Sequence, residues 1–147
     1  MKKRIAIAAA IILALLIGML FLKKEMTPHN YGTAKKECES FLQKNNAVME
    51  EIAVNCFREG EETSGYYKEH HYSYENDFVR FYVGSQGMLG GQYWDLIYTK
   101  DGVFYGESEK YLYEEAGDGN NIIRAEKLDE HWWFLWSDYD GTDRSYK

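Results

Sequence analysis

The chain has 147 residues; five of its 17 Lys and Arg residues lie within the first 24 positions, whereas all 24 Asp and Glu residues come later. The remainder therefore carries a net charge of −12, which argues against nucleic acid or an anionic membrane face as a partner and favours solubility beside a membrane. Its length of about 120 residues suits one domain with one core and is too short for two.

Residues 5–22 form an uninterrupted apolar run of 18 residues with basic residues directly on both sides. At about 1.5 Å per residue, a helix of this length measures roughly 27 Å, close to the thickness of the hydrocarbon core of a bilayer. The run has neither the small-x-small cleavage site of a signal peptide nor the polar face of a soluble helix. We therefore expect an uncleaved transmembrane signal anchor over residues 1–24, with a cleaved signal peptide and a buried helix as alternatives.

The charges on the two flanks of this run predict its orientation. Lys2, Lys3 and Arg4 precede it together with the α-amino group, whereas Lys23 and Lys24 follow it beside an acidic residue. Because cytoplasmic flanks are enriched in Lys and Arg, we expect a single-pass protein of the cell membrane with its N-terminus in the cytoplasm. Residues 25–32 contain the only proline and are expected to be a linker, so residues 33–147 would form one extracytoplasmic domain.

The first expected element of the domain is an amphipathic helix over residues 33–59, with Thr33 as its N-cap and Gly60 just after its end. Asn45 interrupts the apolar face near its middle, which fits a polar residue at the edge of a core or a register device in a coiled coil. The apolar or small residues recur at three- and four-residue spacing: Ala34, Cys38, Phe41, Leu42, Val48, Met49, Ile52, Ala53, Cys56 and Phe57.

The chain's two cysteines, Cys38 and Cys56, both fall on this helix. Their separation of 18 residues corresponds to five helical turns, or about 27 Å, and a disulfide needs Cα atoms within about 7 Å. We therefore expect free core cysteines, with a bridge across a broken helix as the alternative. Two cysteines without His or Cys partners at ligand spacing also argue against a zinc site.

From Tyr66 onward, aromatic and β-branched residues punctuated by glycine indicate short antiparallel strands. The Asp101–Gly102 pair predicts a tight hairpin turn, and residues 117–121 and 127–130 predict two more turns. The expected fold is α+β, with the long amphipathic helix packed on a curled antiparallel β-meander. The expected strands cover residues 66–74, 78–83, 93–99, 103–107, 111–115, 122–126 and 132–137.

A glycine-rich segment, residues 84–91, is one candidate binding site. It lacks the Gly-Lys-Ser/Thr ending of a phosphate-binding loop and the spacing of a dinucleotide fingerprint, and no helix is expected to follow it. A flexible loop joining two strands is the simpler interpretation, although long glycine loops also serve as binding sites. The candidate residues are Gly84, Ser85, Gln86, Gly87, Gly90 and Gly91.

The sequence assigns no catalytic residue, metal ligand or cofactor. Residues 138–143 resemble the start of a calcium loop, but the chain ends before the glutamate at position 12, leaving a solvated acidic turn or a partial calcium site. His70 and His71 are adjacent, so on a strand they face opposite ways and cannot jointly hold a metal. No serine lies in a Gly-x-Ser-x-Gly motif, so a hydrolase with unrecognised carboxylates is only a third functional alternative.

The aromatic residues 132–136 provide the second candidate binding site, with Trp132, Trp133 and Trp136 as its residues. Neighbouring residues on a strand alternate faces, so one set of these rings must point away from the helix. Sheet curvature could cover the outward rings. Otherwise they would form an exposed platform of the kind that stacks on sugars or docks a protein.

The whole pattern resembles the small membrane-anchored hypothetical proteins of Gram-positive gut bacteria. The resemblance depends on the basic start and single span, the amphipathic helix, VGSQG at residues 83–87, YWDLIYTKDG at 93–102 and HWWFLW at 131–136. In that family, a glycine-rich loop precedes an aromatic strand ending in a turn, and a further aromatic strand closes the chain. The family has no assigned activity, so the resemblance assigns no functional residue.

The sequence therefore predicts a membrane-anchored extracytoplasmic interaction module, held to the membrane by residues 5–22, whose partner is a protein of the cell envelope. The glycine loop and the outward aromatic rings would be its contact surface. A cell-wall glycan-binding domain that uses exposed aromatic side chains is the alternative. No cofactor and no nucleic acid are expected.

Overall fold

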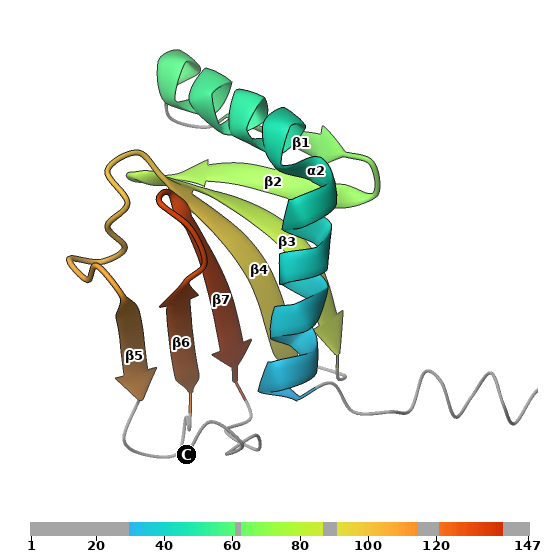
Figure 1. Ribbon diagram of the computed structural model, residues 1–147, viewed down its shortest axis with the longest axis vertical. Helices are drawn as coiled ribbons and strands as arrows, with labels where there is room; N and C mark the ends of the chain where they lie inside the picture. Colours follow the sequence, from blue (N-terminus) through green and yellow to red (C-terminus); the bar gives the residue numbers. More distant parts are fainter. Residues whose placement is uncertain (1–29, 61–62, 87–90, 115–120, 140–147) are drawn as a thin grey trace, which may run out of the picture.

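The computed structural model describes residues 30–60, 63–86, 91–114 and 121–139. These residues form one helix packed on a seven-stranded antiparallel sheet (Figure 1), which confirms the predicted α+β class. The elements in chain order are α2 (Tyr31–Glu59), β1 (Ser64–Tyr67), β2 (His70–Glu75), β3 (Phe78–Gln86), β4 (Gln92–Thr99), β5 (Lys110–Glu114), β6 (Ile122–Lys127) and β7 (Trp132–Asp138).

Helix α2 is fixed at both ends by local hydrogen bonds. The Asn30 side chain accepts a hydrogen bond from the Thr33 N–H at 3.0 Å, and the Thr33 hydroxyl accepts one from the Asn30 N–H at 2.9 Å. This capping box makes Asn30 the N-cap, so the predicted cap at Thr33 was wrong by three positions. The predicted end is confirmed, because Gly60 takes a φ of 87° and donates its N–H to the Cys56 carbonyl.

The face of α2 that contacts the sheet carries both cysteines and Asn45. Cys38 and Cys56 are buried free thiols, which confirms the expectation that one continuous helix keeps them apart. Asn45 is also buried; its Nδ2 donates to the Phe41 carbonyl at 2.7 Å, and its Oδ1 accepts from the Tyr67 hydroxyl at 3.0 Å. Asn45 therefore acts as a polar residue of the core face that binds the helix to the β1–β2 hairpin.

The sheet is not the predicted simple meander. Its strand order is β1-β2-β3-β4-β7-β6-β5, so β7 returns to the middle of the sheet and pairs with β4, and β5 lies at an edge. Burial accounts for this order, because every residue of β7 and all but one of β4 are buried. The two most buried strands of the described sheet thus lie side by side, where each has a neighbouring strand on both edges and a hydrophobic cluster on both faces.

Three local predictions were wrong for identifiable reasons. Residues 66–74 form not one strand but parts of the β1–β2 hairpin, which turns at Lys68 with a φ of 55°. Residues 103–107 form no strand of the sheet and instead make a tight turn closed by a bridge between Phe104 and Glu107. Gly102 does turn with a φ of 74°, but the chain then crosses the sheet instead of forming a hairpin with β4.

Hydrophobic clusters cover both faces of the sheet. On the first face, α2 packs over β2, β3, β4 and β7 and forms the larger cluster (Figure 1). On the opposite face, Phe104 from the segment after β4 packs against Phe78 and Trp133, with ring centroids 5.2 and 5.8 Å away. The centre of the sheet is therefore enclosed from both sides.

The predicted anchor, residues 5–22, lies outside the described part of the chain, as do the linker up to residue 29 and residues 140–143 of the acidic turn. Within the described ranges, no helix combines the length and apolarity needed to span a membrane.

Candidate functional site

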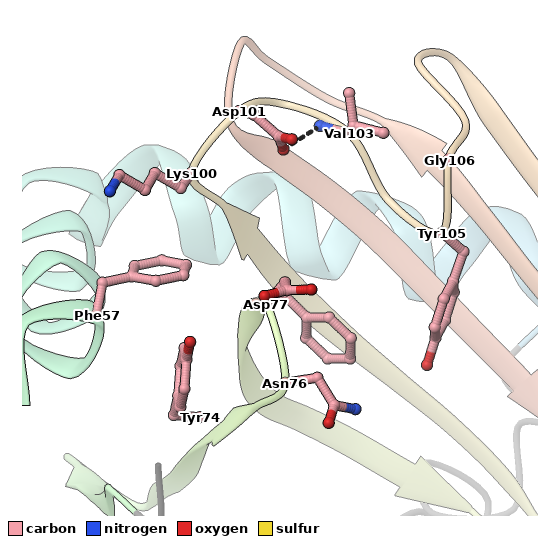
Figure 2. A pocket seen from close by; sticks show the side chains of 10 residues that line it. Phe57, Tyr74, Asn76, Asp77, Lys100, Asp101, Val103, Tyr105 and Gly106 are labelled. Carbon is pink, nitrogen blue, oxygen red and sulfur yellow. Dashed lines mark hydrogen bonds between the residues drawn. The ribbon is translucent and has the colours of Figure 1, made fainter. Parts of the chain in front are cut away.

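A cleft of about 720 Å³ lies at the end of the sheet where β3 begins and β4 ends. We call it the turn cleft, because the β2–β3 turn and the segment after β4 form most of its walls, while the end of α2 contributes Phe57 (Figure 2). Its lining residues are Phe57, Tyr74, Asn76, Asp77, Phe78, Lys100, Asp101, Val103, Tyr105 and Gly106.

Strand pairing and backbone conformation assemble the turn cleft. Phe78 pairs with Thr99, which sets the β2–β3 turn beside the residues that leave β4. Asn76 adopts a φ of 54° in that turn, a left-handed conformation that asparagine tolerates well. Tyr105 also adopts a left-handed φ of 48°, which costs a bulky residue about 1–2 kcal/mol. Functional sites often contain such strained residues.

Aromatic rings form two walls of the turn cleft. Phe57 and Tyr74 pack edge to face at 5.3 Å on the side of α2. Phe78 and Tyr105 contact each other at 5.9 Å on the other side, and Tyr105 also packs on Phe104 at 4.5 Å. Tyr105 nevertheless leaves 62% of its surface exposed, so this ring is held in place while presenting a face to solvent.

Polar groups lie between these rings. Figure 2 shows Asp77 between the Phe57–Tyr74 pair and the ring of Tyr105. The Asp101 carboxylate accepts a hydrogen bond from the Val103 N–H at 3.0 Å, whereas no described residue hydrogen-bonds to the side chains of Asn76, Asp77 and Lys100. The turn cleft can therefore offer an amide, a carboxylate and an ammonium group to a ligand that packs on its rings.

A second polar cluster lies on the face of the sheet opposite α2. Arg80 on β3 donates from Nε and Nη2 to Oδ2 of Asp95 on β4, at 3.0 and 2.6 Å. Burial raises the pKa of Asp95 and the Arg80 guanidinium only partly offsets this, so the pKa rises to about 6. Tyr82, Tyr93 and Tyr139 surround Arg80 and line a depression of about 340 Å³.

The glycine loop predicted as a binding site adjoins the opposite end of β3 from the turn cleft. Gly84 lies so close to Trp94 that a Cβ would come within 2.4 Å of the indole, so this glycine serves packing. Ser85 is exposed, Gln86 donates its side-chain amide to Gln92 at 2.9 Å, and Gly91 is buried. Gly87 and Gly90 lie outside the described residues.

The tryptophans of β7 do not form the exposed platform that the sequence allowed. Trp132 and Trp136 face α2, while Trp133 faces the hydrophobic cluster around Phe104 on the opposite face of the sheet; their exposed fractions are only 3%, 0% and 0%. The outward side is covered, but by the ring of Phe104 that packs on Trp133 and not by the sheet curvature that the sequence allowed as the alternative to a platform. His70 and His71 face opposite sides as predicted, since the first packs on Phe41 of α2 and the second on Tyr82.

The described ranges hold no cluster of three or more His, Cys, Asp or Glu side chains that could bind a metal ion.

Sequence reasoning missed the turn cleft, because its residues come from three segments that only the strand order brings together. The one local signal was the polar pair Asn76–Asp77 between two aromatic strands.

Comparisons of the chain with protein-family models, with curated proteins and with solved structures find no match.

Proposed function

We propose that this chain is a binding module anchored in the cell membrane, which contacts a protein of the cell envelope on the extracytoplasmic side. In this proposal residues 5–22 span the bilayer with the N-terminus in the cytoplasm, and the α+β domain lies outside. The apolar length of the run and the excess of cations before it support the anchor.

The turn cleft is the observation that carries the binding role. Tyrosine and phenylalanine are the ring types enriched in protein interfaces, and Tyr105 presents its ring at low entropic cost because its neighbours already hold it. Asn76, Asp77 and Lys100 provide hydrogen-bonding groups around the rings. A protein segment with an apolar anchor and backbone amides or carbonyls beside it would match this arrangement.

A cell-wall glycan is the second candidate ligand. Aromatic rings pack on the C–H faces of sugars, and carboxylate and amide groups hydrogen-bond to sugar hydroxyls. Both kinds of group line the turn cleft, as Tyr105 and Asp77 illustrate. In this alternative the turn cleft takes the role that the sequence suggested for the tryptophans of β7.

Site-specific photo-crosslinking of the full chain in intact cells tests the proposal. A photoreactive amino acid in place of Val103, an exposed residue of the cleft wall, is expected to give one defined protein adduct. Tyr105→Ala in the same chain is expected to reduce that adduct about tenfold, the effect of losing about 1.4 kcal/mol of contact energy.

The matched control carries the photoreactive residue at Val48, which is exposed on α2 outside the cleft. Identical adducts from positions 48 and 103, or an adduct that Tyr105→Ala leaves unchanged, would refute the proposed contact site. Binding of the full chain in detergent to purified peptidoglycan distinguishes the second candidate, which requires that Tyr105→Ala and Asp77→Asn both weaken binding.

A further inference from the structure

Strand β5 forms an edge of the sheet whose outer side pairs with no described strand. It pairs with β6 without a bulge over five consecutive positions, and the Lys127 N–H donates to the Glu109 carbonyl at 3.0 Å. Backbone groups of an antiparallel strand alternate between its two sides. Residues 109, 111 and 113 therefore bond to β6, and Lys110, Leu112 and Glu114 direct their N–H and C=O groups to the open edge.

The sequence of β5, Lys-Tyr-Leu-Tyr-Glu, is complementary to itself when read in the antiparallel direction. If two copies pair around Leu112, each Lys110 occupies the register position opposite the partner's Glu114, and each Tyr111 is opposite the partner's Tyr113. Opposite charges and aromatic pairs at facing positions are both favourable in antiparallel sheets. The same register aligns the outward backbone groups for about six reciprocal hydrogen bonds.

The exposure of the β5 side chains agrees with this pairing. Leu112 is 55% exposed and Tyr113 is 45% exposed, on opposite faces of the strand. A strand edge that pairs with no described strand, carries such residues and lacks proline is a site where another strand adds readily. In the pairing around Leu112, Tyr113 would extend the ring cluster of Phe104, Tyr105 and Tyr111, whose centroids lie 4.5 to 5.8 Å apart.

We propose that two copies of the chain associate through antiparallel pairing of β5 around Leu112, which joins their two sheets into one. The interface is isologous, since the same strand serves both copies, and its two-fold axis passes beside Leu112. Although Tyr111 packs on Tyr105, no residue of β5 lines the turn cleft, so either proposal can be refuted without refuting the other.

Cysteine crosslinking of the full chain in its membrane or in detergent tests this register. Leu112→Cys is expected to form a disulfide-linked dimer on mild oxidation, because Cα atoms of such a pair lie about 5.5 Å apart. Lys110→Cys alone is expected to give at least tenfold less dimer, because the two copies of residue 110 would be four positions apart, about 13 Å. Native Cys38 and Cys56 are buried and do not compete.

A mixture of Lys110→Cys and Glu114→Cys chains is expected to crosslink as efficiently as Leu112→Cys, since these positions face each other. In chains without added cysteine, Lys110→Glu is expected to weaken dimerisation about tenfold, and the exchange Lys110→Glu with Glu114→Lys to restore it. Equal crosslinking through positions 110 and 112, failure of the mixture, or a monomeric wild-type chain at every concentration would overturn the proposal. Unchanged thermal unfolding of each variant ensures that the fold is intact.

Discussion

At the scale of single residues, Asp95 and Glu126 respond to burial in opposite ways. Both carboxylates are buried, but Asp95 meets one cation, Arg80, and its Oδ1 has no hydrogen-bond partner among the described residues. Burial also raises the pKa of Glu126, yet hydrogen bonds from Lys35, Arg124 and Tyr31 outweigh it and lower the pKa to about 2. The number of donors around each carboxylate explains the difference.

These pKa shifts predict two pH windows of stability. Asp95 stabilises the folded state most below pH 3.8, its ordinary pKa, where the carboxyl is protonated in both states. As pH rises towards 6, the free energy of unfolding falls by up to about 3 kcal/mol. Asp95→Asn should therefore flatten the free energy of unfolding between pH 4 and 6 in urea titrations. Glu126 stabilises the folded state above pH 4.5, its ordinary pKa, and this stabilisation is lost as pH falls towards 2. Glu107→Gln changes an exposed carboxylate and serves as the control. If the free energy of unfolding of Asp95→Asn changed with pH as it does in the wild-type chain, the raised pKa would not belong to Asp95.

At the scale of elements, the β1–β2 hairpin depends on one helical side chain. Asn45 accepts hydrogen bonds from the Tyr67 hydroxyl and from Lys68 Nζ, at 3.0 and 2.8 Å, and Lys68 is the residue that turns the hairpin. Among the described elements, the hairpin contacts α2 and one neighbouring strand, β3. It should therefore open before the centre of the sheet does.

Asn45→Ala is expected to destabilise the hairpin by about 1–3 kcal/mol, because it leaves Tyr67 and Lys68 without their buried acceptor. Hydrogen exchange should show faster exchange of the β1 and β2 amides with little change in β4 and β7. Gln43→Ala changes an exposed amide of the same helix and is the matched control. Equal exchange rates in the two variants would mean that Asn45 does not hold the hairpin.

Elements were predictable where local pattern and burial agree. The spacing of Ala34, Cys38 and Met49 identified α2, and the apolar runs that became β4 and β7 were located to within one residue at each end. The β1–β2 turn was missed because Lys68 is not a typical turn residue and is stabilised in the left-handed region by tertiary contacts. Phe104 was assigned to a strand because its neighbours alternate, although its ring inserts into the hydrophobic cluster that contains Phe78 and Trp133.

At the scale of the whole molecule, the predicted anchor can be tested directly. The full chain should remain in the membrane pellet after alkaline extraction, and protease added outside the cell should digest the domain. Replacing Leu13 and Leu16 by Lys should release it, because each charge near the centre of a span costs about 2.5–3.5 kcal/mol. Release of the wild-type chain by alkali, or protection of the domain from external protease, would contradict the proposed topology.

The turn cleft shows what sequence patterns cannot supply at this scale. Phe57, Asp77 and Tyr105 come from a helix end, a turn and a crossing segment. They meet because β3 pairs with β4 and because the segment after β4 crosses to β5 past the inserted β7. Nothing in the local composition indicates that insertion. The tryptophans of β7 were predicted as a binding surface for the same reason. The position of Phe104, whose ring covers Trp133, could not be predicted without the strand order.

The burial of β4 and β7 also provides a spectroscopic reporter. All four tryptophans of the chain, Trp94, Trp132, Trp133 and Trp136, lie on these two strands with at most 3% of their surface exposed. Their fluorescence should be blue-shifted in the native state and should report unfolding at the centre of the sheet. Trp94 and Trp136 stack at 6.0 Å, so their coupled transitions should mark the β4–β7 pairing specifically. Because no tryptophan lines the turn cleft, this signal can follow folding independently of ligand binding.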